Sequence, residues 1–355
     1  MELVVNEDVF FLFINDSYFA WNYKSHKQHK LSLIAINVIA DFSLQKNYPS
    51  VVEELISVNI LISKKTSKTH WKWDVLSKIF HFGTLRYSNS NFEKNAKDLS
   101  KGYVEYCNSI IEKIPLDCFD ICYGQTKYET LEKNFPEFDL LKKILENRHT
   151  NRTFTNKNIP FDKISLILNY TFGYRDHDKR EYEKKGLHTP TKRRTSSSGG
   201  SLQSCEGYLI SMNIDGIEPG VYHFRSNQRN LGKISSIPLE FSFGSLCGGQ
   251  YFADNLNAAI VITCRFDKLM WKYQHSHSYR VALLDAGHLS QTIQLIASVL
   301  DIRTWVTAAF YDDILLNLLQ LDEELMEYPL IILGLGTGPK NPFDANLEDI
   351  FVNEC

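Results

Sequence analysis

The chain has 355 residues, of which 43% are hydrophobic and 23% are charged, and its formal net charge is −3. This is the composition of an ordinary globular protein, and the charge shows neither the basic excess of a nucleic-acid-binding protein nor an acidic tail. The length exceeds that of most single domains, so we expect two. Aromatic residues make up 13% of the chain, which suits a stacking pocket or an interface as well as a packed core.

No segment has the pattern of an export signal or a membrane span. The early apolar run Val9–Ile14 is short and follows acidic rather than basic residues. The run Leu31–Ala40 contains polar residues and is too short to cross a bilayer. The seven cysteines are scattered and include no C-x-x-C pair, which favours free thiols over a zinc site. We therefore expect a cytoplasmic protein with no metal.

The N-terminal part reads as strand, helix, helix, strand. An F-F-L-F-I-N strand is followed by helical patterns at Leu31–Phe42 and Val51–Val58 and by a strand-like segment at Ile60–Lys64. This order is typical of a winged helix, which can bind DNA, bind a peptide or be purely structural. The second helical pattern contains Glu53 and Glu54 but no Lys or Arg. Contact with nucleic-acid phosphates is therefore disfavoured there, and peptide recognition is the preferred role.

The middle of the chain is predicted to be helical. The segment Trp71–Phe82 has the spacing of an amphipathic helix that ends at Gly83. His81 near its end reads more readily as a packing or capping residue than as a functional one. A long polar helix is expected at about Phe92–Ile114. We place the domain boundary after it, giving a winged-helix-like domain at 1–140 and a second domain at 141–355.

The second domain mixes strands and helices. Strand-like runs cover Gly207–Met212, Gly220–Phe224, Ala258–Phe266 and Leu330–Leu335, and helical patterns cover Phe161–Phe172, His288–Leu300 and Asp312–Leu319. They follow no regular β-α-β spacing, and no G-x-G-x-x-G turn is present. An α+β fold is therefore expected rather than a Rossmann fold. The basic segment Arg175–Arg194 is either a solvated loop or a lid that contacts a peptide.

Two short motifs in this domain suit a phosphate or a flat ring. The run Thr195–Gly200 combines hydroxyl residues with two glycines, so the backbone could approach a ligand closely. Alone it could be a flexible linker, but arginines precede it and a strand follows. Arg148 and Arg152 flank the hydroxyl of Thr150, a spacing that suits phosphate but also occurs on solvated surfaces.

Longer stretches carry a resemblance to a known family. The segments R-R-T-S-S-S-G-G-S-L-Q-S-C-E-G-Y (193–208) and W-K-Y-Q-H-S-H-S-Y-R-V-A-L-L-D-A-G-H (271–288) resemble the SagB-type flavin-dependent dehydrogenases. These are nitroreductase-fold enzymes that oxidise azoline rings in peptides to azoles. The similarity extends over most of residues 145–338 through the G-I-E-P-G-V-Y-H-F, L-C-G-G-Q and G-L-G stretches. Before residue 140 it is less specific, and the W-K-W and F-H-F-G-T segments (71–84) resemble longer members.

The sequence departs from the family pattern at three positions in and directly after the serine-glycine motif. Ser197 and Ser204 stand where the family pattern has proline, and Gln203 stands where it has histidine, whereas Glu206 and Tyr208 match. Loss of the prolines should loosen the loop. Any role that the family gives to the histidine is in doubt here.

The resemblance implies a nitroreductase-like fold, a non-covalent FMN and a homodimer whose interface completes the pocket. The helix that begins near Gly287 would lie at that interface. The residues implied to bind the cofactor are Arg148, Thr150, Arg152, Ser196, Ser197, Ser198, Gly199, Gln250, Arg280, His288, Gln291, Gly334 and Gly336.

Lys272 and Tyr273 are the catalytic pair that the resemblance implies. Conversion of an azoline to an azole removes a proton from Cα and a hydride from the neighbouring carbon. A lysine can take the proton only if burial or nearby cations lower its pKa, and a tyrosine hydroxyl can donate or relay a proton. A lone Lys-Tyr dipeptide would carry no information, but here Arg280 follows at the family's spacing. His275 and His277 depart from the pattern and are alternative bases or solvent-facing side chains.

Three functions follow from these patterns. The first is an FMN-dependent dehydrogenase that matures a ribosomally made peptide, with the precursor peptide as substrate and a cyclodehydratase complex as a further partner. The second keeps the flavin but acts on another peptide bond or on a small molecule. The third is a non-catalytic winged-helix binding protein. We expect no nucleic-acid partner and no membrane association.

Overall fold

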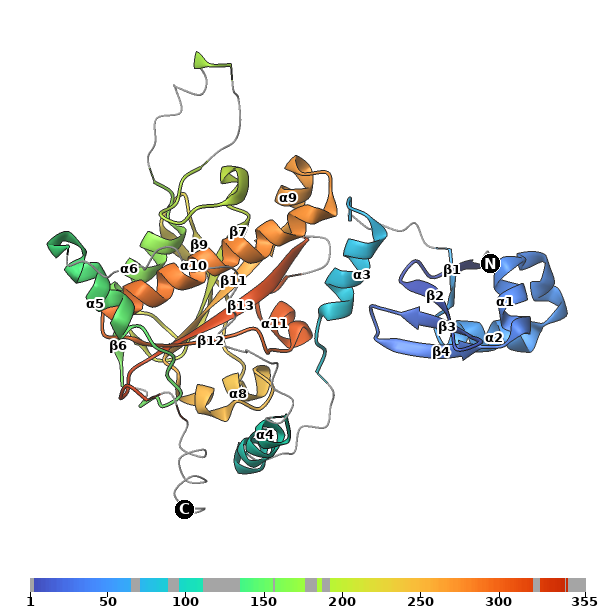
Figure 1. The fold of residues 1–355 in the computed structure, drawn as a ribbon, viewed down its shortest axis with the longest axis horizontal. Coiled ribbons are helices and arrows are strands. Elements are labelled where there is room, and N and C mark those ends of the chain that lie inside the picture. The colour runs from blue at the N-terminus through green and yellow to red at the C-terminus, as the bar shows by residue number, and fades with distance from the viewer. Residues whose placement is uncertain are drawn as a thin grey trace, which may run out of the picture. The chain divides into compact units, whose positions relative to one another are not determined.

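The computed structural model describes residues 3–64, 71–88, 96–110, 135–155, 157–175, 184–186, 192–321, 326–341 and 343. The chain forms two compact units (Figure 1). The N-terminal unit comprises Met1–Leu85 and Met270–Tyr279, and the sheet unit comprises Arg86–Leu269 and Arg280–Cys355. The start of the polar helix expected from Phe92 and most of the basic segment 175–194 lie outside the described residues.

The N-terminal unit begins with strands and continues with helices. Its elements are β1 (Leu3–Val5), β2 (Val9–Ile14), β3 (Ser17–Asn22), β4 (Lys27–Leu31), α1 (Leu33–Ala40), a 3-10 helix (Phe42–Asn47), α2 (Pro49–Ser57), β5 (Leu61–Ser63) and α3 (Val75–Thr84). Strands β2, β3 and β4 form an antiparallel sheet, and β1 pairs antiparallel with β5. A buried apolar cluster joins α1 and α2 to this part of the chain. The predicted helix, helix, strand order is therefore present, while a winged-helix role stays a prediction.

Capping residues determine where these helices begin. Ser32 accepts a hydrogen bond from the backbone N–H of Ala35 at the start of α1, and Pro49 is the first residue of α2. The predicted helix start at Trp71 is wrong. The side chain of Asp74 caps α3, and the helix begins at the next residue, Val75. The two tryptophans of the W-K-W motif therefore precede α3.

The elements that follow α3 along the chain supply the larger part of the fold, although the 3-10 helix at Ser276–Ser278 belongs to the N-terminal unit. They are α4 (Ala96–Ile110), a 3-10 helix (Pro136–Phe138), α5 (Asp139–Asn147), β6 (Ile159–Pro160), α6 (Phe161–Phe172), a 3-10 helix (Gly199–Ser201), β7 (Cys205–Ser211), β8 (Ile214–Asp215), β9 (Gly220–Arg225), β10 (Asn230–Ser235), α8 (Phe243–Leu246), a 3-10 helix (Tyr251–Asn255), β11 (Ala258–Arg265), α9 (Phe266–Lys272), a 3-10 helix (Ser276–Ser278), α10 (Tyr279–Val299), β12 (Arg303–Thr307), α11 (Asp312–Leu318) and β13 (Glu327–Gly336). The predicted helix at Phe161–Phe172 is confirmed. Helix α10 starts well before the predicted His288.

A six-stranded sheet organises the sheet unit. Its strand order is β10-β9-β7-β11-β13-β12, and every neighbouring pair is antiparallel. Strand β11, with the sequence A-A-I-V-I-T-C-R, is buried over seven of its eight residues because neighbouring layers cover both of its faces. Figure 1 shows α10 running across this sheet. The α+β prediction is confirmed, since this main sheet is antiparallel throughout; the short strands β6 and β8 pair in parallel as a separate two-stranded sheet.

The N-terminal unit is shorter than the domain predicted at 1–140. The backbone N–H of Arg86 donates to Asp312 over 2.7 Å, and the backbone N–H of Ser88 donates to Asp313 over 3.0 Å. These bonds join the chain to the start of α11 directly after α3. Within the described residues, none of the helices has both the length and the hydropathy of a membrane span.

Candidate functional site

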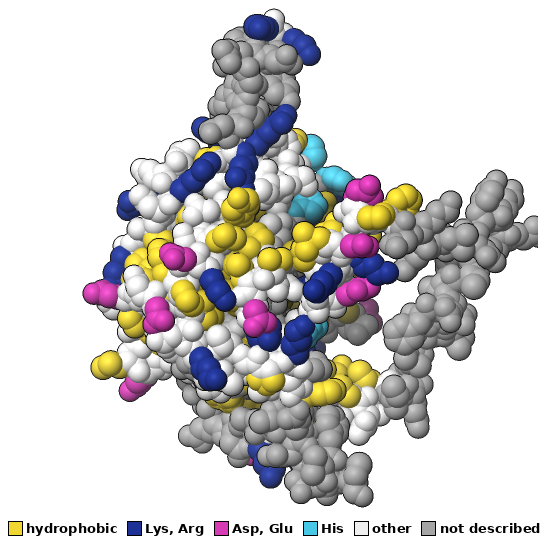
Figure 2. All heavy atoms as spheres, turned by 90° about the vertical axis from the view of Figure 1, so that its left-hand side faces the viewer, with side chains coloured by type: hydrophobic (Ala, Val, Ile, Leu, Met, Phe, Trp, Pro, Cys, Tyr) yellow, Lys and Arg dark blue, Asp and Glu magenta, His cyan; other side chains and the backbone are white. Residues whose placement is uncertain are grey.

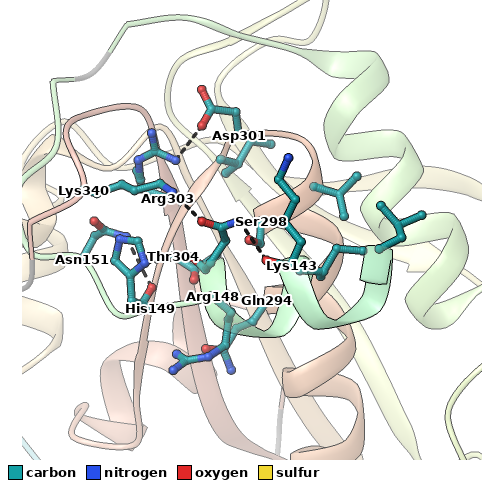
Figure 3. Close-up of a pocket in the computed structure, with 15 residues that line it drawn as sticks. Lys143, Arg148, His149, Asn151, Gln294, Ser298, Asp301, Arg303, Thr304 and Lys340 are labelled. Carbon is teal, nitrogen blue, oxygen red and sulfur yellow. Dashed lines mark hydrogen bonds and ion pairs between the residues drawn. The ribbon is translucent and has the colours of Figure 1, made fainter. Parts of the chain in front are cut away.

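A cavity of about 410 Å³ lies in the sheet unit, between α5, the residues that follow it, the end of α10 and the start of β12. Its lining residues are Leu140, Lys143, Ile144, Asn147, Arg148, His149, Asn151, Gln294, Ser298, Val299, Asp301, Ile302, Arg303, Thr304 and Lys340. Four of them are Lys or Arg, and Asp301 is the one carboxylate in this set. Figure 3 shows these side chains around the opening. The lining therefore favours an anionic ligand.

Some of the cavity's cations are held by neighbouring groups. Arg303 donates to Asp301 over 2.8 Å and to the carbonyl of Gly338 over 2.9 Å. Lys340 donates to the Asn147 side chain over 3.1 Å. These bonds orient both cations at the cavity. With the charge of Arg303 balanced by Asp301, the lining keeps a net positive charge.

The R-H-T-N-R segment is fixed between β12 and the C-terminal part of the chain. Thr150 forms a parallel β-bridge with Thr304, and the backbone N–H of Arg152 donates to the carbonyl of Asn341 over 3.0 Å. Arg148, at the end of α5, lines the cavity, whereas Thr150 and Arg152 are not among its lining residues. Arg152 is instead near Tyr103 of α4; the pKa of Tyr103 is raised chiefly by its hydrogen bond with Cys107, and Arg152 acts in the opposite direction.

The serine-glycine loop is attached to α10 by a buried carboxylate. Asp285 accepts a hydrogen bond from the Ser198 hydroxyl over 2.7 Å and another from the backbone N–H of Gly199 over 3.0 Å. Burial raises the pKa of Asp285, and the two hydrogen bonds oppose that effect. A Cβ at Gly199 would lie 2.3 Å from Val281 of α10, so only glycine allows this approach. Gly200 follows with a φ of 59°.

Two further bonds hold the same loop. The hydroxyls of Ser196 and Thr292 lie 2.6 Å apart, and the Ser197 hydroxyl is 3.2 Å from Nδ1 of His288. The loop is therefore fixed along α10 even though its family prolines are missing. The hydroxyls that the resemblance assigns to the flavin take part in this attachment, and their contact with a cofactor stays a prediction.

The C-terminal glycines and Gln250 have contacts within the chain. A Cβ at Gly334 would lie 2.7 Å from Leu256, and one at Gly336 would lie 2.5 Å from Phe154. A side chain at either position of β13 would therefore crowd a neighbouring side chain. Gln250 donates to the backbone carbonyl three residues before it over 2.9 Å. The structure gives these residues structural roles, and their binding to a cofactor also stays a prediction.

Helix α10 presents an exposed face in the sheet unit. The predicted residues Arg280, His288 and Gln291 are exposed on it, together with Leu284, which is 61% exposed. A Cβ at Gly287 would meet open space. Other exposed apolar residues of α6 and α10 are Leu166, Tyr170, Leu283 and Val299. Figure 2 shows hydrophobic side chains gathered on the face that it presents.

Lys272 and Tyr273 belong to the N-terminal unit. Lys272 is the last residue of α9 and is exposed, and its Nζ lies 5.7 Å from the centre of the Tyr273 ring. The backbone carbonyl of Tyr273 accepts a hydrogen bond of 2.7 Å from the Trp73 indole. The rings of His275 and His277 follow, 6.3 Å apart, and both side chains are exposed. The single chain does not provide the burial that a lysine base requires.

The family matches at Glu206 and Tyr208 have a structural role. Burial alone would raise the pKa of Glu206, but its hydrogen bond with His223 and the charges of Lys268 and Arg194 lower it to about 2. Lys268 donates to this carboxylate over 2.6 Å. The Tyr208 hydroxyl donates to a buried glutamate of β13 over 2.9 Å. These bonds connect β7 with its neighbours in the sheet.

Sequence reasoning missed four residues of the site. Lys143, Arg303 and Lys340 line the cavity, and Asp285 holds the serine-glycine loop. Lys143 lies on α5, which ends next to the first arginine of the predicted motif, and Lys340 follows the glycine-rich stretch at the end of the last strand. These positions offered a signal, but only the fold brings their side chains to one cavity.

Comparison with known proteins agrees with this architecture. The sequence model of the nitroreductase family matches residues 145–337, more than half of the chain. A nitroreductase-type protein of Methanocaldococcus jannaschii is 22% identical over 59% of this chain and 97% of its own length. The trifolitoxin-processing protein TfxB of Rhizobium leguminosarum is 26% identical over 70% of this chain and 66% of its own. The microcin B17-processing protein McbC of Escherichia coli is 28% identical over 41% of this chain and 54% of its own length.

Solved structures include the E. coli microcin synthetase McbBCD complex with truncated pro-MccB17 bound, with a TM-score of 0.47, 20% identity and coverage of 69% of this chain and 94% of that chain. A nitroreductase from Desulfovibrio desulfuricans in complex with FMN has a TM-score of 0.38 and 13% identity, and the match covers 58% of this chain and 90% of that chain.

Proposed function

Because this chain belongs to the nitroreductase family of oxidoreductases, we propose that it binds FMN and oxidises azoline rings of a ribosomally made peptide to thiazole or oxazole. The observation that carries the proposal is the Lys272–Tyr273 pair within the W-K-Y…Y-R pattern. The similarity to two peptide-processing proteins supports the same substrate class. The substrate is then a modified precursor peptide, and a cyclodehydratase complex that makes the azoline is the expected partner.

The residues of the sheet unit fit the phosphate of FMN. The cationic cavity supplies Arg148, Lys143 and Lys340 as partners for a phosphate, and Arg303 is held beside them. The serine-glycine loop, which Asp285 holds along α10, is the segment to which the resemblance assigns the flavin ring. Bound FMN would supply the acceptor for the hydride that leaves the azoline ring.

Lys272 and Tyr273 account for the proton that the reaction releases. The azoline loses two hydrogens, one as a hydride and one as the Cα proton, and we assign the proton to Lys272. The Tyr273 hydroxyl is assigned to the ring nitrogen, which it can polarise as a donor. Lys272 is exposed in one chain, so bound flavin, peptide or a partner subunit has to exclude water before the lysine becomes an effective base.

The exposed face of α10 is the proposed homodimer interface. It combines Leu283 and Leu284 with Gly287, where a second helix backbone could come close. The same helix holds the serine-glycine loop through Asp285 and His288. A partner that packs on this face would therefore cover the region where the ring is expected. An isologous dimer would form two equivalent flavin sites.

Leu284→Asp is expected to convert the dimer to a monomer and to reduce the FMN retained per chain. A carboxylate placed in an apolar interface without a partner opposes association. Size-exclusion chromatography with light scattering measures the mass, and visible absorbance measures bound flavin. Leu239→Asp is the matched control, since Leu239 is a fully exposed leucine of the sheet unit outside α10. A Leu284→Asp protein that stays dimeric would contradict this interface.

The test of the function is the oxidation of a synthetic peptide that carries one thiazoline. The purified protein is expected to contain FMN and to yield a product lighter by two hydrogens, detected by mass spectrometry. Release of FAD on heating, or of no flavin, would contradict the cofactor assignment. An FMN-containing protein that leaves the thiazoline unchanged would contradict the substrate assignment.

The archaeal relative favours a second candidate. Its match extends over 97% of a nitroreductase-type protein, which favours a flavin-dependent oxidoreductase that acts on a small molecule. Reduction of a nitroaromatic compound with NADH, without activity on the thiazoline peptide, would support this alternative. A colourless protein would favour a binding role.

A further inference from the structure

The segment that carries the Lys-Tyr pair is attached to the N-terminal unit. Met270–Tyr279 is grouped with Met1–Leu85 rather than with the sheet unit. Within this unit its contacts include residues of the segment 71–82, which contains the W-K-W and F-H-F motifs. We call 71–82 the tryptophan segment and 270–279 the lysine-tyrosine segment. The proposed reaction leaves the tryptophan segment without an assigned role.

The first contact fixes the backbone of Tyr273. The indole N–H of Trp73 donates to the Tyr273 carbonyl over 2.7 Å, although the two residues are 200 positions apart in sequence. Trp73 is only 7% exposed, so water competes little for this bond and it is stronger than an exposed one. The carbonyl belongs to the same residue as the phenol ring. Holding it limits the directions in which the ring can point.

The second contact uses the cap of α3. The Asp74 side chain accepts hydrogen bonds from the Ser276 hydroxyl and from the backbone N–H of Ser77, and these bonds lower the pKa of Asp74. Asp74 is adjacent to Trp73, so one short stretch before α3 supplies both bonds. The start of this helix is thereby coupled to the lysine-tyrosine segment.

The third contact involves a buried histidine. Nδ1 of His81 lies 3.1 Å from the Tyr279 hydroxyl, and Phe80 packs edge-on against the Tyr279 ring with centroids 5.2 Å apart. His81 is 1% exposed, and burial lowers its pKa to about 3, so it is neutral near pH 7. A packing role alone was expected to suffice for His81. Its hydrogen bond adds to that role, because it reaches Tyr279, the first residue of α10.

The three contacts fall at Tyr273, Ser276 and Tyr279, at intervals of three residues along the lysine-tyrosine segment. We propose that Trp73, supported by Asp74 and His81, is a positioning residue that holds Lys272 and Tyr273 in the geometry for proton transfer. This inference rests on the proposed function. It assigns the N-terminal unit a part in catalysis in addition to peptide recognition.

One consequence concerns truncation. Removal of residues 1–140 would delete Trp73, Asp74 and His81 together. A truncated protein is therefore expected to lose turnover of short peptides as well as long ones. Such a deletion cannot separate peptide recognition from chemistry, and single substitutions are needed.

Trp73→Phe tests the inference in the full-length protein with FMN bound. The change removes the indole N–H and keeps an aromatic ring. With a peptide that carries one thiazoline, kcat is expected to fall between about tenfold and a hundredfold, because a lost bond and a small misplacement both act on the reacting groups. KM should stay within about twofold, since a positioning residue acts on the reaction step rather than on binding. Hydrogen exchange of peptides covering 270–279 should become faster.

Trp21→Phe is the matched control. Trp21 lies on β3 of the same unit, is 40% exposed, and its ring packs against Phe10. This variant is expected to keep the wild-type kcat and the wild-type exchange at 270–279. If Trp73→Phe does not fold, Tyr279→Phe replaces it, because it removes only the hydroxyl that faces His81. It should change kcat and exchange in the same direction by a smaller factor.

The outcomes separate this inference from the proposed function. Unchanged exchange at 270–279 in Trp73→Phe would overturn the positioning role whatever the activity. A lower melting temperature with wild-type kcat per folded enzyme would also overturn it, since Trp73 would then be structural. A wild-type protein that binds FMN and does not oxidise the thiazoline peptide would instead refute the proposed function.

Discussion

Lys272→Ala is expected to lower the oxidation of a thiazoline peptide by at least about a hundredfold while FMN stays bound, because general acid–base groups typically supply ~10²–10⁴-fold in rate. Lys272 is the exposed last residue of α9 and is not among the residues that line the cationic cavity. The measurement is single-turnover flavin reduction under anaerobic conditions. Visible absorbance of the same sample reports the bound cofactor.

Conservative variants define the role of the pair. Lys272→Arg should not restore the rate, because a guanidinium does not release its proton near neutral pH. Tyr273→Phe keeps the ring and should also lose turnover. Near-normal turnover by Lys272→Ala would make the lysine structural, and His275→Ala and His277→Ala would then be the next variants to examine.

The fold could be predicted where one local signal dominates. Phe161–Phe172 has an apolar period and a glycine directly after it, and α6 has these bounds. The strand at Ala258 is a continuous apolar run. The start of α3 was mispredicted because the apolar period at Trp71 competes with the cap at Asp74, and the cap determines the start. Local pattern alone does not rank such competing signals.

The site could be predicted only as separate motifs. The resemblance identified Ser198 and Lys272, but their environment depends on residues far away in sequence. Ser198 is bound by Asp285, 87 positions later, and Tyr273 is bound by Trp73, 200 positions earlier. The spacing of Arg148 and Arg152 also suggested one shared target. The backbone path along β12 places only Arg148 among the residues of the cavity.

This difference between the two arginines makes Arg148→Ala the sharpest test of the cofactor site. Arg148 lines a cavity whose other cations already include Lys143 and Lys340. Loss of a charge-assisted hydrogen bond to phosphate costs about 1.5–3 kcal/mol, which corresponds to roughly a tenfold to hundredfold weaker Kd. Titration of the apoprotein with FMN, followed by flavin fluorescence, measures the constant. Riboflavin, which lacks the phosphate, should bind the variant and the wild type equally.

Two adjacent lysines of α5 control for the loss of charge itself. Lys143 lines the cavity, whereas Lys142 is exposed, lies 3.8 Å from Glu146 and is not among the lining residues. Lys143→Ala should weaken FMN binding, and Lys142→Ala should not. Arg152→Ala distinguishes the cavity from the sequence motif: a loss as large as that of Arg148→Ala would place both arginines at the phosphate, as the resemblance implies. Equal FMN affinity of wild type and Arg148→Ala would refute the cavity as the phosphate site. A phosphate that loses a charged partner must bind with a measurably higher Kd.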